Sequence, residues 1–252
     1  TTDAFPKIMG VKVEIGGKEV TVLGIAKGAG MIHPNMATML CYIATDCAIS
    51  PGILDKALRK AVDLSFNSIT VDGDTSTNDT VLVLANGAAG NRPLSSRSKD
   101  MESFQSALNH VTLELAKMIV RDGEGATKVI EINVIGAVSK GSAKKVANAI
   151  GRSNLVKTAF FGMDPNWGRI AAAAGYSGVK VAPEKMDIYF NDLQVVKNGL
   201  CVGGDWEIKA REAMKGPEVR VTVNLNLGKA EGTVWASDLT YEYVKVNASY
   251  RS

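Results

Sequence analysis

Few side chains in this sequence could carry out chemistry. Histidine occurs only at His33 and His110, and no Ser-His-Asp signature is visible. His110 falls in a stretch with helical periodicity and is interpreted as a surface residue. No Cys/His spacing fits a zinc site. The run at residues 27–30, Lys-Gly-Ala-Gly, lacks the Gly-Lys-Ser/Thr ending of a Walker loop. The residue types therefore carry no signature of triad, zinc or Walker-type chemistry.

Residues 27–40 are the most informative segment. They form a loop broken by glycine and proline, followed by a buried strand that begins near a threonine, Thr38. On residue types alone, this is an ordinary loop with a threonine at the start of a strand. The polar run at residues 72–79 could suggest calcium, but it lacks the EF-hand spacing and the terminal glutamate. It is interpreted as a structural loop.

The elements that must position these residues follow from periodicity and turn signals. Gly16-Gly17 predicts a hairpin between two short strands. Ser50 as N-cap and Pro51 at the first position predict a helix. Apolar residues every three or four positions predict an amphipathic helix over residues 101–122. The predicted strands are residues 11–15, 20–23, 39–45, 68–71, 80–85, 128–135, 156–161, 186–190, 218–225 and 231–235, and the other predicted helices are 51–65, 142–151, an Ala-rich helix after 164–169, and 205–214.

Strands and helices mix without strict β-α-β alternation, and several strands are adjacent in hairpins. This pattern favours a layered α/β fold with substantial antiparallel pairing over a doubly wound sheet. A length of 252 residues is enough for one large domain or two small ones.

Composition narrows the class of protein. The net charge is +3 with no basic run, which argues against a nucleic-acid partner. No apolar stretch approaches the roughly 20 residues that span a bilayer, and no signal peptide is visible. The three cysteines are an odd number without close pairing, which favours a reducing compartment. We therefore expect a cytoplasmic protein with no membrane partner.

Several long motifs resemble one family in the same order along the chain. Residues 27–40 meet every fixed position of K-G-x-G-M-I-x-P-N-M-A-T-M-L, the self-processing site of the glutamate N-acetyltransferase (ornithine acetyltransferase) family. The resemblance spans the whole chain. The other matching segments are residues 1–3 (TTD), 71–79 (VDGDTSTND), 121–128 (RDGEGATK), 162–169 (GMDPNWGR) and 243–252 (YVKVNASYRS).

This resemblance implies a layered α-β-β-α sandwich with mixed, largely antiparallel sheets, and cleavage between Ala37 and Thr38. Residues 1–37 would be the end of an α chain, and residues 38–252 a β chain that starts at the nucleophile. A threonine hydroxyl needs a base within reach. The new α-amine of Thr38, with a pKa of about 7.7–8.0 in model peptides, would supply one.

The resemblance also implies the reaction and its other residues. Thr38 would take acetyl from N-acetylornithine and pass it to glutamate in a ping-pong cycle, within arginine biosynthesis. No cofactor is implied, and the sequence leaves open whether acetyl-CoA is a second acetyl donor. Substrate contacts are expected from Thr1 (or Thr2, if the register is off by one), Lys27, Glu124, Asn247 and Ser252. The ordinary alternative is that Lys27 and Glu124 are solvated loop residues.

Other implications concern assembly and completeness. The family forms assemblies of paired chains, here expected as two α and two β chains. Its precursor continues before the segment that matches Thr1, and that part holds a Thr-Gly pair that forms the oxyanion hole. Residues 1–252 are therefore expected to be the C-terminal two-thirds of the protein. Two alternatives remain: a related self-cleaving amidohydrolase or aminopeptidase with an N-terminal threonine, and a non-catalytic fragment.

Overall fold

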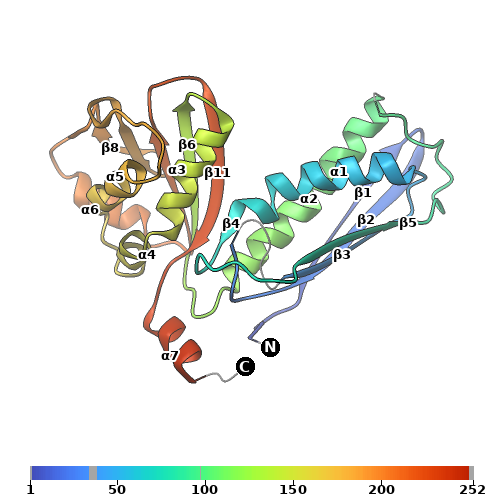
Figure 1. The fold of residues 1–252 in the computed structure, drawn as a ribbon, viewed down its shortest axis with the longest axis horizontal. Coiled ribbons are helices and arrows are strands. Elements are labelled where there is room, and N and C mark those ends of the chain that lie inside the picture. The colour runs from blue at the N-terminus through green and yellow to red at the C-terminus, as the bar shows by residue number, and fades with distance from the viewer. Residues whose placement is uncertain (1, 34–38, 97, 250–252) are drawn as a thin grey trace. The chain divides into compact units, whose positions relative to one another are not determined.

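The computed structural model describes residues 2–33, 39–96 and 98–249. The chain divides into two compact units, which are described separately (Figure 1). The first unit comprises Thr1–Ile69 and Asp74–Asp122, and the second comprises Thr70–Gly73 and Gly123–Ser252. This division does not follow the expected boundary between residues 37 and 38. That boundary is one of chain cleavage, so it stays a prediction.

The first unit is a four-stranded sheet with two helices on one face (Figure 1). The strand order is β1-β2-β3-β5; β1 and β2 are antiparallel, β2 and β3 are antiparallel, and β3 and β5 are parallel. The expected hairpin at Gly16-Gly17 is confirmed, and both glycines have positive φ. The elements are β1 (Lys7–Ile15), β2 (Lys18–Lys27), β3 (Leu40–Thr45), α1 (Pro51–Leu64), the 3-10 turn η1 (Phe66–Ser68), β5 (Thr80–Ala85) and α2 (Lys99–Arg121).

A glycine lets α2 approach the sheet closely. A Cβ on Gly24 would lie 2.7 Å from Leu115 Cδ1 and 3.0 Å from Val111 Cγ1. Both of these α2 residues are fully buried, so a larger residue at position 24 would push the helix away from the sheet. The α2 helix therefore packs closely against β2 at Gly24.

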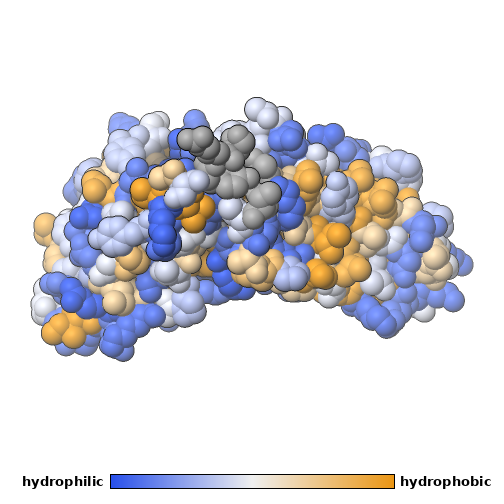
Figure 2. Space-filling view, turned by 90° about the horizontal axis from the view of Figure 1, so that it is seen from below, coloured by the Kyte–Doolittle hydropathy of each residue, from blue (hydrophilic) through white to orange (hydrophobic). Residues whose placement is uncertain are grey.

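The opposite face of this sheet, called the open face here, carries apolar side chains. Alternate residues of a strand share a face, and on the open face these residues are 42–61% exposed. Figure 2 shows orange side chains gathered over this sheet. An exposed apolar patch on one sheet face is typical of a surface that another protein segment covers. The large apolar residues of the open face are Ile8, Leu23, Ile25, Tyr42, Leu82 and Leu84.

The second unit is built on a mixed sheet with the strand order β4-β11-β6-β10-β7-β8-β9. The central strands β6 and β10 are parallel, and their outer neighbours β11 and β7 run antiparallel to them. The elements are β4 (Ile69–Thr70), β6 (Val129–Ala137), α3 (Lys140–Arg152), α4 (Asn154–Phe161), α5 (Trp167–Gly175), η2 (Pro183–Lys185), β7 (Asp187–Phe190), β8 (Leu193–Lys197), β9 (Leu200–Cys201), α6 (Trp206–Ala213), β10 (Glu218–Asn224), β11 (Ala230–Ser237) and α7 (Tyr241–Ser249).

The expected α/β class, with layers of helix and sheet and largely antiparallel pairing, is confirmed. One predicted element is wrong. The run at residues 156–161 is not a strand but part of helix α4. The Ser153 side chain caps this helix by accepting the Val156 N–H at 3.3 Å, and Val156 and Phe160, four residues apart, are both buried. Helical spacing thus buries the apolar side chains that a strand would have divided between two faces.

The described helices include none that is long and apolar enough to cross a membrane.

Candidate functional site

The nucleophile expected from the motif, Thr38, lies outside the described residues, as do Ala37, Thr1 and Ser252. The structure does describe Lys27, Glu124 and Asn247, together with the residues that flank Thr38. The site is therefore built from these neighbours. Lys27 belongs to the first unit, whereas Glu124 and Asn247 belong to the second.

Lys27 is the last residue of β2 and pairs with Leu40 in the antiparallel ladder. Leu40 lies two residues after Thr38, so this register places Lys27 beside the strand that the expected nucleophile precedes. Lys27 is exposed and shares the open face with Leu23 and Ile25 because alternate strand residues project to the same side. An exposed ammonium at this position can pair with a substrate carboxylate.

Asp79 holds the backbone at Met39, the residue that follows Thr38 in the sequence. Its Oδ1 accepts the Met39 N–H at 2.7 Å, and the Thr80 N–H donates to the Met39 carbonyl at 3.1 Å. Burial raises the pKa of Asp79 to about 6, although the Met39 hydrogen bond and the Lys27 charge both act to lower it. The polar run 72–79 was expected to be a structural loop, and its last residue indeed secures the start of β3.

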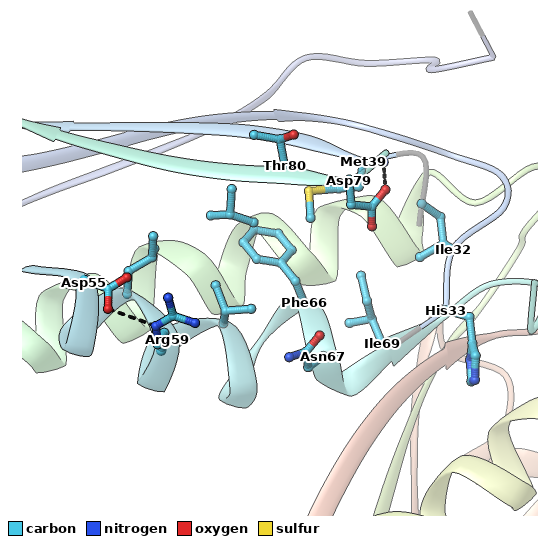
Figure 3. Close-up of a pocket in the computed structure, with 13 residues that line it drawn as sticks. Ile32, His33, Met39, Asp55, Arg59, Phe66, Asn67, Ile69, Asp79 and Thr80 are labelled. Atoms are coloured by element: carbon cyan, nitrogen blue, oxygen red, sulfur yellow. Dashed lines mark hydrogen bonds and ion pairs between the residues drawn. The ribbon is translucent and has the colours of Figure 1, made fainter. Parts of the chain in front are cut away.

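A cavity of about 520 Å³ opens beside Met39 on the helix-covered side of this sheet (Figure 3). Asp79 lies at one end of the cavity, and an ion pair of two α1 residues lies at the other end. In this pair, Arg59 Nε lies 2.9 Å from Asp55 Oδ2. Lys27 does not line this cavity, since it projects from the opposite face. Apolar and polar side chains both line the cavity: Ile32, His33, Met39, Asp55, Leu58, Arg59, Val62, Phe66, Asn67, Ile69, Asp79, Thr80 and Val81.

In the second unit, Glu124 and Asn247 are in direct contact. Asn247 Nδ2 donates to Glu124 Oε2 at 2.8 Å, and the same amide donates to the Tyr243 carbonyl at 3.0 Å. The second bond spans one turn of α7 and orients the amide toward Glu124. Glu124 lies near the start of the second unit's long segment, and Asn247 lies near its end. The motifs single out these two residues separately, and the fold joins them by a hydrogen bond.

Glycine is required beside Glu124 because α7 begins there. Gly125 has a φ of +68°, and a Cβ on it would lie 2.5 Å from the Tyr243 backbone nitrogen. The Thr240 hydroxyl donates to the Gly125 carbonyl at 2.7 Å and accepts the Glu242 N–H at 3.2 Å. The Gly-Glu-Gly sequence therefore allows close packing of the α7 amino terminus against the loop that carries Glu124.

A second anchor for this loop is Asp238. Its carboxylate accepts the Thr127 N–H at 2.8 Å, the Thr127 hydroxyl at 2.5 Å and the Lys128 N–H at 3.1 Å. Beside it, the buried Lys157 ammonium donates to the Val71 carbonyl at 2.6 Å, to the Ser237 hydroxyl at 3.1 Å and to the Ser237 carbonyl. Burial lowers the pKa of Lys157 to about 8, against the opposing effect of two nearby aspartates. These contacts give the Glu124 loop a rigid base.

Sequence reasoning missed Asp79, Asp238 and Lys157 as residues that support the site. Each belongs to or adjoins a recognised motif or strand end, but its partner lies far away in sequence. Among the described residues, no group of three or more His, Cys, Asp or Glu side chains could hold a metal ion.

The fold and these contacts define a mixed α/β protein whose expected substrate-binding side chains lie on a strand end, a loop and a terminal helix. A model of the ArgJ family matches residues 1–252. The chain is 53% identical to the arginine biosynthesis bifunctional protein ArgJ of Geobacter sulfurreducens, and 53% identical to the protein of the same name from Symbiobacterium thermophilum. This chain belongs to the ArgJ family, and the resemblance seen in its motifs is confirmed.

The chain is shorter than these relatives. The matches cover 100% of this chain but 64% of the Geobacter protein and 62% of the Symbiobacterium protein. A solved structure also matches, the crystal structure of arginine biosynthesis bifunctional protein ArgJ from Bacillus halodurans. It has 44% sequence identity and a TM-score of 0.80, and the match covers 83% of this chain and 98% of that chain.

Proposed function

We propose that this chain is part of a glutamate N-acetyltransferase that moves acetyl from N-acetylornithine to glutamate through an acetyl-Thr38 intermediate. The observation that carries the proposal is the ArgJ family match over residues 1–252, within which the Lys27 to Leu40 motif is complete. The names of the relatives assign those proteins to arginine biosynthesis.

The proposed cycle begins after cleavage between Ala37 and Thr38. The Thr38 hydroxyl attacks the acetyl carbonyl of N-acetylornithine and gives its proton to the Thr38 α-amine. The bond between the acetyl carbon and nitrogen breaks, and the departing ornithine amine takes that proton. The glutamate amine then attacks the Thr38 ester, so that the ester oxygen regains a proton and N-acetylglutamate leaves.

Charge and geometry support the roles of the other residues. Both substrates carry an α-carboxylate, which suits the exposed Lys27 ammonium, and ornithine adds a side-chain ammonium, which suits a carboxylate such as Glu124. Asn247 holds one oxygen of Glu124 at 2.8 Å and thereby orients the carboxylate. Thr1 and Ser252 are proposed as further substrate contacts.

The length of a solved relative's chain is compatible with cleavage before Thr38. The match to the Bacillus halodurans structure covers nearly all of that chain but 83% of this one. The solved chain is therefore shorter than this chain by about the length of the segment that precedes Thr38. A separate chain that starts at the corresponding threonine would have this length.

Two further aspects belong to the same proposal. The cleaved α and β chains would assemble as two of each, in the cytoplasm. All three cysteines are free, and two of them are buried, which suits a reducing compartment.

The test uses the full-length protein with N-acetylornithine and glutamate. We expect ornithine and N-acetylglutamate as products, parallel double-reciprocal plots, and one added acetyl mass on the peptide that starts at Thr38. Thr38→Ala should stay uncleaved and inactive, and Thr158→Ala, a change to an exposed helical threonine, should leave both unchanged. A separate arm replaces N-acetylornithine with acetyl-CoA. Transfer of the acyl group to water alone would instead assign a hydrolase, and intersecting plots would remove the acyl-enzyme.

A further inference from the structure

A lysine is fully buried at the start of β1. Lys7 has 0% side-chain exposure, and its Nζ lies 2.6 Å from Asp3 Oδ1 and 2.5 Å from Asp122 Oδ2. The side chain of Asp122 is 3% exposed and that of Asp3 is 24% exposed. The ammonium also lies 5.2 Å from the centre of the Phe5 ring, within the range of a cation–π contact.

Burying such a charged group has a high cost in desolvation free energy. Removing charges from water costs several kcal/mol per ion, and an apolar replacement of similar volume is often as stable. The cluster therefore calls for an explanation other than stability, and its backbone contacts provide one.

The two carboxylates bind backbone groups from separate parts of the chain. Asp122, at the end of α2, accepts the Ala4 N–H at 2.9 Å and 3.2 Å with its two oxygens. Asp3 Oδ1 accepts the Gly28 N–H at 2.8 Å. Lys7 thus joins residues 3–4, the glycine-rich loop and the α2 terminus, all within the first unit.

The residues tied together adjoin two expected substrate contacts. Asp3 follows Thr1-Thr2, and Gly28 follows Lys27. The bond between Asp3 and the Gly28 N–H fixes the distance between these two segments, and Lys7 fixes Asp3. We propose that Lys7, through Asp3 and Asp122, is a positioning residue that holds Thr2, which precedes Asp3, and Lys27, which precedes Gly28, in register for one substrate carboxylate.

This inference rests on the proposed function. It is supported by the ionisation of Asp3. Burial alone would raise the pKa of this carboxyl, but hydrogen bonds from Lys7 and the Gly28 N–H, together with the Lys7 charge, lower it overall. Asp3 is therefore ionised at neutral pH and remains an acceptor for both groups.

The test replaces Lys7 with methionine in the full-length protein, which keeps the apolar stem and removes the ammonium. The matched control is Lys12→Met on the same strand. Lys12 pairs with Glu19 at 2.7 Å, but these side chains are 65% and 66% exposed. We expect Lys7→Met to raise the KM for N-acetylornithine and for glutamate about tenfold and to change kcat less than about threefold, because ground-state positioning is lost. Lys12→Met should change neither.

Hydrogen exchange supplies a readout that does not depend on acetyl transfer. In Lys7→Met, the Ala4 and Gly28 amides should exchange at least tenfold faster, with the amides at the centre of β2 unchanged. Asp3→Asn retains an acceptor oxygen for Gly28 and should give an intermediate KM. It also carries the test if Lys7→Met does not fold.

A lower melting temperature with unchanged KM values would overturn the positioning role. Unchanged exchange at Ala4 and Gly28 would show that Lys7 does not hold these two segments together. If the unaltered protein transfers no acetyl group, the proposed function fails. The exchange result then still decides whether Lys7 holds these segments together.

Discussion

Asn247 donates a hydrogen bond to Glu124 at 2.8 Å, although 123 residues separate them in sequence. Both residues lie at the surface of the second unit, where a single exposed hydrogen bond contributes little to stability. The second donor of the Asn247 amide is used within α7, so the side chain is directed at Glu124. The contact is therefore expected to matter for substrate binding more than for folding.

A double-mutant cycle tests this relationship. Glu124→Gln and Asn247→Ala should each lower kcat/KM for acetyl transfer about tenfold or more. In the double variant, kcat/KM should be no more than about threefold lower than in the more impaired single variant. The reason is that the effects of substituting two residues in contact are not additive. Lys245→Met, which removes an exposed ion pair with Glu242 on the same helix, is the control and should retain activity. Fully additive losses would show that Glu124 and Asn247 act separately.

The buried Lys157 predicts a pH-dependent stability. Its pKa in the folded protein is about 8, below the ordinary value of 10.5, so between these values the unfolded chain binds more protons. The free energy of unfolding should therefore rise with pH across this window, by up to about 1.4 kcal/mol per pH unit from this group.

Comparison with Lys157→Met isolates that contribution. All three tryptophans lie in the second unit, so their fluorescence during urea unfolding follows this unit. The buried Cys41 and Cys47 lie in the first unit. The variant loses the donor to the Val71 and Ser237 carbonyls and should be less stable by about 1–3 kcal/mol at pH 8. The deficit should widen toward pH 10. A deficit that is constant with pH would show that Lys157 does not titrate in this range.

The three thiols should differ sharply in reactivity. Burial raises the pKa of Cys41 to about 12 and that of Cys47 to about 11, and both side chains are fully buried. Cys201 is exposed. Because the thiolate is the reactive form, iodoacetamide at pH 8 should alkylate Cys201 and spare the other two until denaturant is added. Peptide mass spectrometry identifies the alkylated cysteines. Alkylation of Cys41 or Cys47 in the native protein would contradict this placement.

The open face predicts the behaviour of residues 1–252 when they are expressed alone. Leu84 and Ile25 are 61% and 48% exposed within an apolar patch (Figure 2), so the chain should associate as its concentration rises. Ile25→Lys with Leu84→Lys should reduce this association in sedimentation experiments. Ile208→Lys, on α6 of the second unit at a position that is 75% exposed, should not. Equal effects of both changes would mean that added charge, and not the open face, controls solubility.

Much of the fold could be predicted from local pattern. The Gly16-Gly17 hairpin and the amphipathic α2 helix were expected because each has a period and a boundary residue of its own. Residues 156–161 were predicted incorrectly, because a short apolar run has no clear period and can suit a strand or a buried helix. The cap at Ser153 and the packing of Phe160 decide for the helix.

The sequence by itself determined the family, since motifs such as residues 27–40 and 121–128 are statements about residue identity and order. It also singled out Lys27, Glu124 and Asn247, one at a time. Only the tertiary structure decided that Asn247 contacts Glu124, and that Lys7 is buried between Asp3 and Asp122. The physical reason is that such contacts join residues far apart in the chain. Their energy depends on burial and geometry, which leave no period or spacing in the sequence.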